Sequence, residues 1–417
     1  MPENFHIDMP EAVRNIIHTI EEHGFKAYAV GGCIRDSILG RNPDDWDITT
    51  SAVPSQIKTF FKRTVDTGIA HGTVTIMIDK TGYEVTTYRI DGEYEDGRHP
   101  KSVEFSDRLV DDLCRRDFTI NAMAYNDTDG FVDEFKGLDD LDTKIIRCVG
   151  EPELRFTEDA LRMMRAIRFS AQLGFTIDEA TWNAIKKLSP SISKISMERV
   201  HVELGKTLMS AHPDYVAQYS EAGLFAPILP VIDNALKSRY KRKILATLQH
   251  TPDNIYLRYA ALFITSTPDE AAKTLRALKL DNKTVNTVSK LVELSKMDIE
   301  ETEPAVRTAL NKYGRDFLPL WHELMMAVIR ASEDITGISN PAKVKHLLTL
   351  KRLGTDILAR GDCFTIKDLD ISGNDLIEYG LQGHEIGETL KSLLDIVIEN
   401  PKLNDKATLI AMIEHIK

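Results

Sequence analysis

Two aspartates with one residue between them, Asp45 and Asp47, follow a pair of glycines, Gly31 and Gly32, in the stretch AYAVGGCIRDSILGRNPDDWDITT at residues 27–50. Two carboxylates about 6 Å apart repel by about 3 kcal/mol at an effective dielectric constant of about 20, so a site that keeps both ionised favours a bound cation. Oxygen ligands favour Mg²⁺, which is often shared with substrate phosphates. Glycines before a helix let backbone N–H groups approach a phosphate chain. Each piece alone is common in ordinary turns, but the combination predicts phosphoryl or nucleotidyl transfer.

The elements that would position these groups are two short strands. An apolar strand is expected over residues 27–30, followed by the glycine turn and a helix, and a second strand is expected to carry Asp45 and Asp47. Side chains alternate between the two faces of a strand. Both acids should therefore project from one face, while Trp46 and Ile48 pack on the other.

A third acid is available on a later strand. The stretch YEVTTYR at residues 83–89 alternates as a strand and places Glu84 and Thr86 on one face. Glu84 is a candidate third acid beside the metal, and an ordinary edge-strand carboxylate is an equally good interpretation.

A charged segment follows this strand. The stretch DGEYEDGRHP at residues 91–100 is rich in glycine and charge and has no periodicity, which predicts a mobile loop. Its composition alone does not indicate a function. The residues of interest in it are Asp91, Tyr94, Asp96 and Arg98.

A cluster of polar residues comes next, in the stretch DDLCRRDFTINAMAYN. Arg115, Arg116, Asp117 and Asn121 lie within about two helical turns of one another. Arginine offers a planar fork to phosphate, and aspartate or asparagine can hydrogen-bond a sugar hydroxyl. The cluster suits a ribonucleotide, and as an isolated string it equally suits a salt-bridged helix start.

A later segment carries a second polar set. The stretch FTEDALRMMRAIRFSAQLGF at residues 156–175 predicts one helix that begins at a Thr157 cap. Its polar positions are Glu158, Asp159, Arg162 and Arg165. Asp159 and Arg162 are three residues apart and should share a face, and Glu158 precedes Arg162 by four and can support it. A surface ion-pair network is the ordinary interpretation, whereas a carboxylate beside a guanidinium can also bond the Watson–Crick edge of a base.

The composition, 42% hydrophobic and 28% charged over 417 residues, is that of a soluble protein with about two to four domains. The first residues do not form a signal peptide, and no run of about 18 apolar residues follows, so we expect a cytoplasmic protein with no membrane partner. The cysteines are far apart and form no CxxC pair, which predicts free thiols and neither a disulfide nor a zinc site. They are Cys33, Cys114, Cys148 and Cys363.

Strand signals end near residue 150, and the remainder is helical in period. The net charge of −12 argues against indiscriminate nucleic-acid binding, which needs locally clustered Lys and Arg. Two such clusters keep a nucleic-acid substrate open, although a solvated helix face explains either one equally well. They are the segment 237–243 and the set Lys343, Lys345, Lys351 and Arg352.

Six motifs occur in one order across residues 31–200: GGCIRD, DDWDITT, EDGRHP, DDLCRRDFTINAMA, EDALRMMRAIRF and ISMERV. This order resembles that of the class II CCA-adding enzymes (tRNA nucleotidyltransferases) of Bacillus-like bacteria, without the histidine-aspartate hydrolase domain of enterobacterial relatives. The resemblance implies an α+β fold, in which an N-terminal polymerase beta-like nucleotidyltransferase head with a mixed sheet precedes an all-α neck, body and tail. The implied boundaries are 1–150 for the head, 151–205 for the neck, 206–335 for the body and 336–417 for the tail.

The resemblance also implies a role for each candidate residue. The implied metal ligands are Asp45 and Asp47, with Glu84 at the strand position of a third acid. The implied triphosphate ligands are Gly31, Gly32 and Arg35, with Asp36 supporting the turn. The residues implied at the ribose are Arg116, Asp117 and Asn121, and those implied at the base are Asp159 and Arg162, with Glu158 orienting Arg162 and Arg165 nearby. The loop at residues 91–100 would be the lever that switches from C to A addition.

The implied reaction is attack of the tRNA 3′-hydroxyl on the α-phosphate of CTP, twice, and then of ATP, with Mg²⁺ as cofactor. The implied contacts with tRNA are to its acceptor arm and elbow. Three alternatives stay open: a poly(A) polymerase of the same class, a partial enzyme that adds only CC or only A, and a catalytically silent RNA-binding protein. The intact loop at 91–100 disfavours the CC-only form, and the presence of both Asp45 and Asp47 disfavours the silent form.

Overall fold

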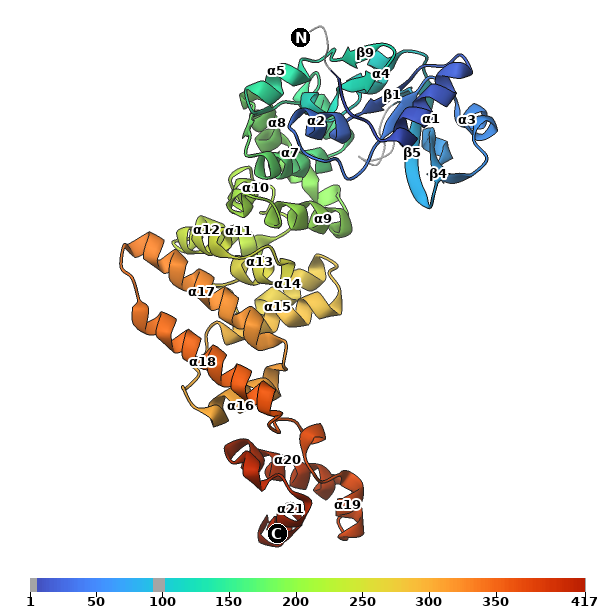
Figure 1. Ribbon diagram of the computed structural model, residues 1–417. Coiled ribbons are helices and arrows are strands. Elements are labelled where there is room, and N and C mark those ends of the chain that lie inside the picture. Colours follow the sequence, from blue (N-terminus) through green and yellow to red (C-terminus); the bar gives the residue numbers. More distant parts are fainter. Residues whose placement is uncertain (1–5, 93–101, 417) are drawn as a thin grey trace. The chain divides into compact units, whose positions relative to one another are not determined.

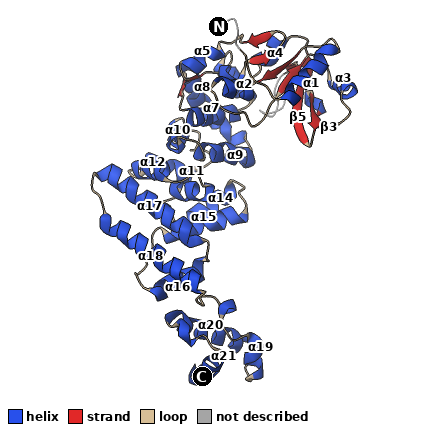
Figure 2. Ribbon diagram, viewed as in Figure 1, coloured by secondary structure: helices blue, strands red, loops and turns tan. Residues whose placement is uncertain are grey.

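The computed structural model describes residues 6–92 and 102–416, and the chain divides into two compact units, Met1–Pro230 and Val231–Lys417. Every described strand lies in the first unit, and the regular elements described in the second are helices (Figures 1 and 2). The expected α+β fold, with a mixed sheet in the N-terminal part and helices after it, is confirmed.

The first unit is built around a seven-stranded sheet with strand order β3-β4-β5-β2-β1-β8-β9. The strands are β1 Ala27–Val30, β2 Ile48–Thr50, β3 Thr64–Gly68, β4 Thr73–Ile78, β5 Thr81–Thr87, β8 Ala124–Asn126 and β9 Gly130–Val132. Neighbouring strands are antiparallel except β2 and β5, which are parallel. The sheet is therefore mixed, and β1 and β2, which flank the diglycine turn and the two aspartates, lie side by side within it.

Two further strand pairs lie outside this sheet: β6 Arg89–Asp91 with β7 Val103–Phe105, and β10 Ile145–Ile146 with β11 Thr176–Ile177. Asp91 was expected in a loop, but its backbone is the end of strand β6 and pairs with Val103. Strand β6 extends as far as Asp91 because β7 pairs alongside it up to Val103. The other expected loop residues, Tyr94, Asp96 and Arg98, lie outside the described part of the chain.

Helix α1 (Glu11–Glu22) packs against β1 and β2. It buries Val13, Ile16, Ile17 and Ile20, whose spacing of three and four residues makes one apolar stripe. The other helices of this unit are α2 Gly32–Ile38, α3 Pro54–Phe60, α4 Leu109–Cys114, α5 Gly137–Asp142, α6 Pro152–Glu158, α7 Leu161–Leu173, α8 Glu179–Leu188, α9 Met197–Leu208 and α10 Ala217–Glu221. Short 3₁₀ turns are η1 Ile69–His71, η2 Thr119–Asn121, η3 Ser189–Lys194 and η4 Pro213–Val216.

The segment at 156–175, expected to be one helix, is two. Helix α6 ends at Glu158, Asp159 has extended dihedral angles (φ −147°, ψ 104°), and α7 begins at Leu161. The break has a local cause, because the Asp159 carboxylate accepts a hydrogen bond from the Leu161 backbone N–H at 3.0 Å and competes with helical bonding. Thr157 is not a cap, since it lies in α6 and its hydroxyl donates to the Glu153 carbonyl.

The second unit contains α11 Pro230–Lys237, which begins at the boundary, then α12 Lys241–His250, α13 Ile255–Leu262, α14 Pro268–Ala277, α15 Asn282–Leu294, α16 Glu303–Tyr313, α17 Phe317–Thr336, α18 Pro341–Arg360, α19 Gly373–Glu378, α20 His384–Glu399 and α21 Lys406–Ile416. Two 3₁₀ turns are η5 Ile366–Asp368 and η6 Pro401–Leu403. Its C-terminal helices pack around a hydrophobic core that includes Leu376, Leu393 and Val397. Among the described helices, none has the length and apolar character needed to cross a bilayer.

Candidate active site

Asp45 and Asp47 lie in the extended segment just before β2 rather than on the strand, which corrects the expectation. The strand begins at Ile48 because pairing with β1 and β5 begins there, although Val30 N–H still donates to the Asp47 carbonyl at 3.0 Å. The expected alternation is confirmed: both acids are exposed, while Trp46 and Ile48 are buried. The two carboxylates therefore lie on the solvent side of the segment.

Glu84 lies beside this pair. The parallel register of β2 and β5 pairs Ile48 with Val85, so the residues that precede them, Asp47 and Glu84, occupy neighbouring positions. Across residues 6–92 and 102–416, however, no group of three or more His, Cys, Asp or Glu side chains is arranged to hold a metal ion. Glu84 adds negative charge to the site without completing a three-carboxylate cluster.

The negative charges of Asp45 and Asp47 lie close enough to Glu84 to affect its pKa, and the charge of Asp45 also affects the pKa of Asp47. Solvent reaches Asp47, but the protein around it removes part of the hydration of its carboxylate and so raises its pKa; Arg116 lowers the pKa and Asp45 raises it. Desolvation followed by the charges of Asp47 and Asp45 also raises the pKa of Glu84. Both shifts disfavour the ionised forms, so a divalent cation placed between the carboxylates would relieve the repulsion.

The diglycine turn lies against Arg116. Gly31 has φ of +85°, which favours glycine, and a Cβ there would be 3.0 Å from Arg116 Nη1. Arg116 is held from the other side by the fully buried Asp112 carboxylate, with Nη2 to Oδ2 at 3.1 Å. The same guanidinium thus neighbours both the glycine turn and Asp47.

Arg35, on α2, is buried and fixed by two partners. Its Nε and Nη2 donate to the two oxygens of Asp36 at 2.9 and 2.7 Å, and its Nη1 donates to Asn121 Oδ1 at 2.6 Å. Its guanidinium also lies over the Phe169 ring, 5.1 Å from the centroid. Asp36 therefore supports Arg35 directly, and Arg35 connects the glycine turn to the ribose candidates.

Asp117 and Asn121 form one network. Asn121 Nδ2 donates to Asp117 Oδ1 at 3.1 Å, and Arg165 Nε donates to Asp117 Oδ2 at 2.7 Å. Burial alone would raise the Asp117 pKa, but Arg165, the Asn121 hydrogen bond and Arg162 outweigh it and lower the pKa well below its usual range. Asp117 is therefore an ionised acceptor whose orientation is set from two sides.

The guanidinium of Arg162 is positioned from α6. Glu158 accepts from Arg162 Nη1 through Oε2 and forms an ion pair with Arg155 Nη2 through Oε1, so one carboxylate bridges two arginines. Arg162 Nη2 also donates to the Arg115 carbonyl at 3.0 Å. The expectation that Glu158 supports Arg162 at i+4 is confirmed even though the helix breaks between them.

The Asp159 carboxylate is held by an arginine from a different helix. Arg199, on α9, donates from Nη1 to Oδ1 at 3.2 Å and from Nη2 to Oδ2 at 2.7 Å. Arg162 meets Asp159 through the backbone, with its N–H donating to the Asp159 carbonyl at 3.0 Å. Sequence reasoning assigned no site role to the arginines and the acid that hold the candidates in place, namely Arg199, Arg155 and Asp112. The motif ISMERV was the available signal for Arg199, and the motif DDLCRRD was the signal for Asp112.

The mixed sheet, the exposed acid pair and the glycine turn define this chain as a nucleotidyltransferase. The family model described as "Poly A polymerase head domain" matches residues 27–147, "Probable RNA and SrmB-binding site of polymerase A" matches 174–236, and "tRNA nucleotidyltransferase domain 2 putative" matches 256–413. The chain is 35% identical to the CCA-adding enzyme of Pediococcus pentosaceus over 98% of both chains, and 37% identical to that of Limosilactobacillus fermentum over 96% of this chain and 95% of the relative. The chain belongs to the CCA-adding enzyme family.

A solved structure gives the same result. The chain resembles the Bacillus stearothermophilus CCA-adding enzyme in complex with CTP with a TM-score of 0.75 and 32% identity, covering 97% of this chain and 96% of that one. The similarity therefore includes both compact units and is not limited to the sheet.

Proposed function

We propose that the chain adds C, C and A in order to the 3′ end of tRNA, using CTP and ATP and releasing pyrophosphate. The main support is sequence similarity to a CCA-adding enzyme over 98% of the chain. The exposed acid pair beside the glycine turn and Arg116 supports it further. The related Bacillus stearothermophilus structure holds CTP, one of the two proposed substrates.

The residues present fit a divalent cation, which we propose to be Mg²⁺. Asp45 and Asp47 are exposed, oxygen-bearing and mutually repelling, and Mg²⁺ commonly takes one or two carboxylates and completes its shell with water and substrate phosphates. Bound there, it would activate the RNA 3′-hydroxyl and hold the triphosphate. Glu84 stays the third candidate because its charge reaches the same site.

The proposed triphosphate site is the turn of Gly31 and Gly32 with Arg35. The absence of a side chain at Gly31 lets Arg116 come within 3.0 Å of the place a Cβ would occupy, and Asp36 keeps the Arg35 fork oriented. Fixed guanidinium groups beside the leaving pyrophosphate stabilise the charge that develops on it.

The proposed ribose contacts are Arg116, Asp117 and Asn121. Asp117 Oδ1 accepts from Asn121 and from the Phe118 backbone N–H, and Oδ2 is bound by Arg165, so the carboxylate is held as an ionised acceptor in one orientation toward the ribose. A site that fixes an acceptor for the 2′-hydroxyl favours ribonucleotides over deoxyribonucleotides, because the latter leave the acceptor unpaired.

The proposed base reader is Asp159 with Arg162, supported by Glu158 and with Arg165 close by. Glu158 fixes the Arg162 fork and Arg199 fixes the Asp159 carboxylate, so donors and an acceptor are presented in set directions. Such a pair can hydrogen-bond the exocyclic and ring atoms of cytosine or adenine, with protein replacing a template strand.

The remaining roles rest on the family. We propose that residues 1–150 are the head, 151–205 the neck, 206–335 the body and 336–417 the tail, and that the outer helices hold the acceptor arm and elbow of tRNA. The segment Asp91–Pro100, with Tyr94, Asp96 and Arg98, is the proposed lever between C and A addition. A tRNA substrate makes the cytoplasm the proposed place of action.

One assay tests this function. Purified protein is incubated with tRNA lacking its 3′ CCA, Mg²⁺ and labelled CTP or ATP, separately and together. Ordered incorporation of C, C and A supports the proposal. A long A tract identifies a poly(A) polymerase, CC or A alone identifies a partial enzyme, and binding without incorporation identifies a silent RNA-binding protein; each of these overturns it.

A further inference from the structure

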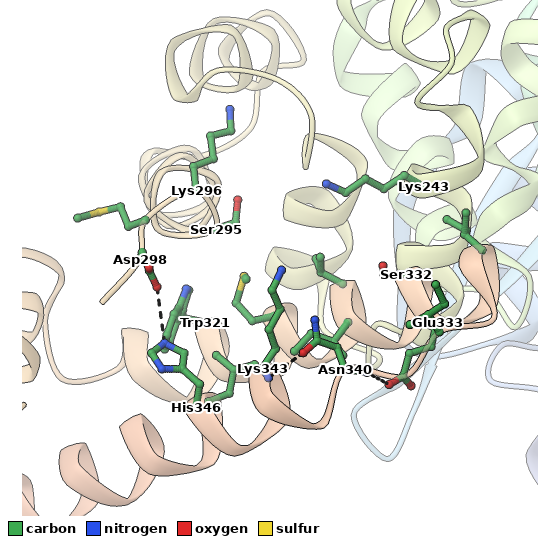
Figure 3. Close-up of a pocket in the computed structure, with 17 residues that line it drawn as sticks. Lys243, Ser295, Lys296, Asp298, Trp321, Ser332, Glu333, Asn340, Lys343 and His346 are labelled. Carbon is green, nitrogen blue, oxygen red and sulfur yellow. Dashed lines mark hydrogen bonds and ion pairs between the residues drawn. The ribbon is translucent and has the colours of Figure 1, made fainter. Parts of the chain in front are cut away.

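A cavity of about 600 Å³ lies in the second unit, outside the unit that holds Asp45 and Asp47. Its walls come from the start of α12, the segment after α15, the length of α17 and the start of α18 (Figure 3). This volume falls within the range of about 300–1,000 Å³ typical of small-molecule sites. Nothing in the proposed nucleotidyl transfer uses it.

The floor of the cavity is apolar. The apolar side chains that line it include Trp321, Met325, Val328, Ile329, Ile335 and Leu347, from α17 and α18. Ile338 lies at the same cavity and is 71% exposed, an unusual state for a large aliphatic side chain. An apolar ligand body of matching size would remove this surface from water, at about 25 cal/mol per Å².

Three lysines border the cavity: Lys243, Lys296 and Lys343. In Figure 3, Lys243 and Lys296 stand on opposite sides of it. The Lys296 ammonium already donates to the Ser266 carbonyl. The ammonium groups of Lys243 and Lys343 have neither a hydrogen bond nor an ion pair within residues 6–92 and 102–416. Two uncompensated cations therefore face an apolar floor.

The geometry of α18 adds to this positive potential. Its first turn lines the cavity, and Asn340 Oδ1 accepts from the Lys343 backbone N–H at 3.1 Å as the N-cap. The N-terminus of a long helix carries partial positive charge. Lys343 also belongs to one of the two basic clusters of the sequence and Lys243 to the other, so the fold brings the two clusters to one cavity.

The acids at the cavity do not neutralise these lysines. Glu333 Oε1 accepts from the Asn340 backbone N–H at 3.1 Å and from the Ser339 hydroxyl at 2.9 Å. Asp298 faces His346, with Oδ1 and Nε2 3.8 Å apart (Figure 3). Among the described residues, neither carboxylate forms an ion pair with Lys243 or Lys343.

We propose that this cavity binds a small amphiphilic organic anion, with an apolar body on the α17 floor and a phosphate, sulfonate or carboxylate group between Lys243 and Lys343. The anion is held by charge and the body by burial, and neither requires RNA. The proposal does not depend on the proposed nucleotidyl transfer, because no residue of the head takes part.

The probe is anilinonaphthalene sulfonate, an aromatic anion of suitable size, titrated into the full-length protein by fluorescence and calorimetry. We expect one saturable site per chain. The double variant Lys243→Glu/Lys343→Glu should weaken binding by about tenfold or more, because two attractive charges become repulsive. Ser332→Trp, at an exposed lining position, should weaken it similarly by filling the space while keeping both lysines.

The matched control is Lys345→Glu/Arg352→Glu, which makes the same change in net charge at exposed positions of α18 that do not line the cavity. It should leave dye affinity within about twofold, since the charges of exposed residues are screened over about 10 Å. Equal loss in the control, non-saturating binding, or no loss in either cavity variant overturns the proposal. The proposal is also overturned if the cavity variants bind the dye normally but no longer bind tRNA, because the lysines would then be contacts for RNA. Thermal melting of each variant confirms that it is folded.

Discussion

Arg199 holds both carboxylate oxygens of Asp159, through hydrogen bonds of 3.2 and 2.7 Å, across 40 residues of sequence. The two side chains are mostly buried, 23% and 16% exposed. A two-point contact from a planar guanidinium fixes the plane of the carboxylate as well as its position. Because Asp159 is the proposed acceptor toward the base, Arg199 sets the direction in which that acceptor points.

The first prediction follows from this contact. Arg199→Lys keeps the positive charge and loses the fork, so the Asp159 carboxylate becomes free to turn. We expect selection of CTP over UTP to fall by about tenfold, the loss of one well-oriented hydrogen-bonding pair, and the free energy of unfolding to fall by about 1–2 kcal/mol. The measurements are incorporation on tRNA lacking its 3′ CCA and chemical denaturation. Glu198→Gln, at an exposed position of the same helix, is the control. A stability loss with unchanged selection would make Arg199 merely structural.

The second prediction concerns Arg162. Arg162→Ala removes the proposed donor to the base but leaves the glycine turn and Arg35 untouched. We expect C-over-U discrimination to drop by about tenfold or more, at about 1–3 kcal/mol for a bidentate contact, with a much smaller change in affinity for the triphosphate. Competition between CTP and UTP measures the first, and inhibition by inorganic triphosphate the second. The exposed pair of Lys187 and Glu153 supplies the control variant Lys187→Ala. Unchanged discrimination would remove Arg162 from base reading.

The sequence predicted those parts of the site that depend on local order. The alternation of exposed acids with Trp46 and Ile48 follows from strand periodicity alone, and the Glu158–Arg162 pair from helical spacing. The predicted start of β2 was too early. A strand begins where its neighbours pair with it, and the first paired residue of β2 is Ile48, which lies opposite Ala29 in β1 and Val85 in β5.

Contacts between distant segments could not be read from periodicity. Asp159 breaks its helix by a side-chain hydrogen bond, which a pattern of apolar residues does not reveal. Its contact with Arg199, and the convergence of Lys243 and Lys343 at one cavity, require the three-dimensional packing of helices far apart in the chain. The order of the motifs identified the segments that form the site, whereas the contacts between their side chains depend on the three-dimensional fold.

The third prediction is a pH dependence. The pKa of Asp117 is lowered in the folded protein, against an ordinary aspartate value of about 3.9, so the folded state holds its proton less tightly than the unfolded state. Its contribution to stability is therefore complete above that ordinary value and is lost as pH falls toward the folded pKa. Asp117→Asn should cost about 3 kcal/mol at neutral pH, because it leaves Arg165 without its buried partner, and the variant's stability should fall less steeply below pH about 4. Denaturation from pH about 7 down to about 3 measures both. The exposed Asp139→Asn should behave like the parent chain.

The fourth prediction addresses catalysis. Asp45→Ala should abolish incorporation of CTP and ATP while tRNA binding is retained, because the change removes a proposed metal ligand and no contact to RNA. Filter binding and labelled incorporation measure the two properties. Asp44→Ala is the matched control, since it removes another exposed acid one residue away. Turnover above background in the Asp45 variant would contradict the metal assignment.

The last prediction separates stability from activity at the same acids. Desolvation and the Asp45 charge raise the pKa of Asp47, so its ionised form destabilises the metal-free fold, and its contribution to stability is greatest at acid pH and falls as pH rises through the raised pKa. Asp47→Asn should therefore raise the melting temperature of the metal-free protein at neutral pH while abolishing incorporation. Mg²⁺ should raise the melting temperature of the parent, where it relieves the repulsion, and have much less effect on the variant. Asp44→Asn should leave both responses as in the parent. If Mg²⁺ stabilised the Asp47→Asn variant as much as the parent, the ion would be binding elsewhere, and the acid pair would not be its site.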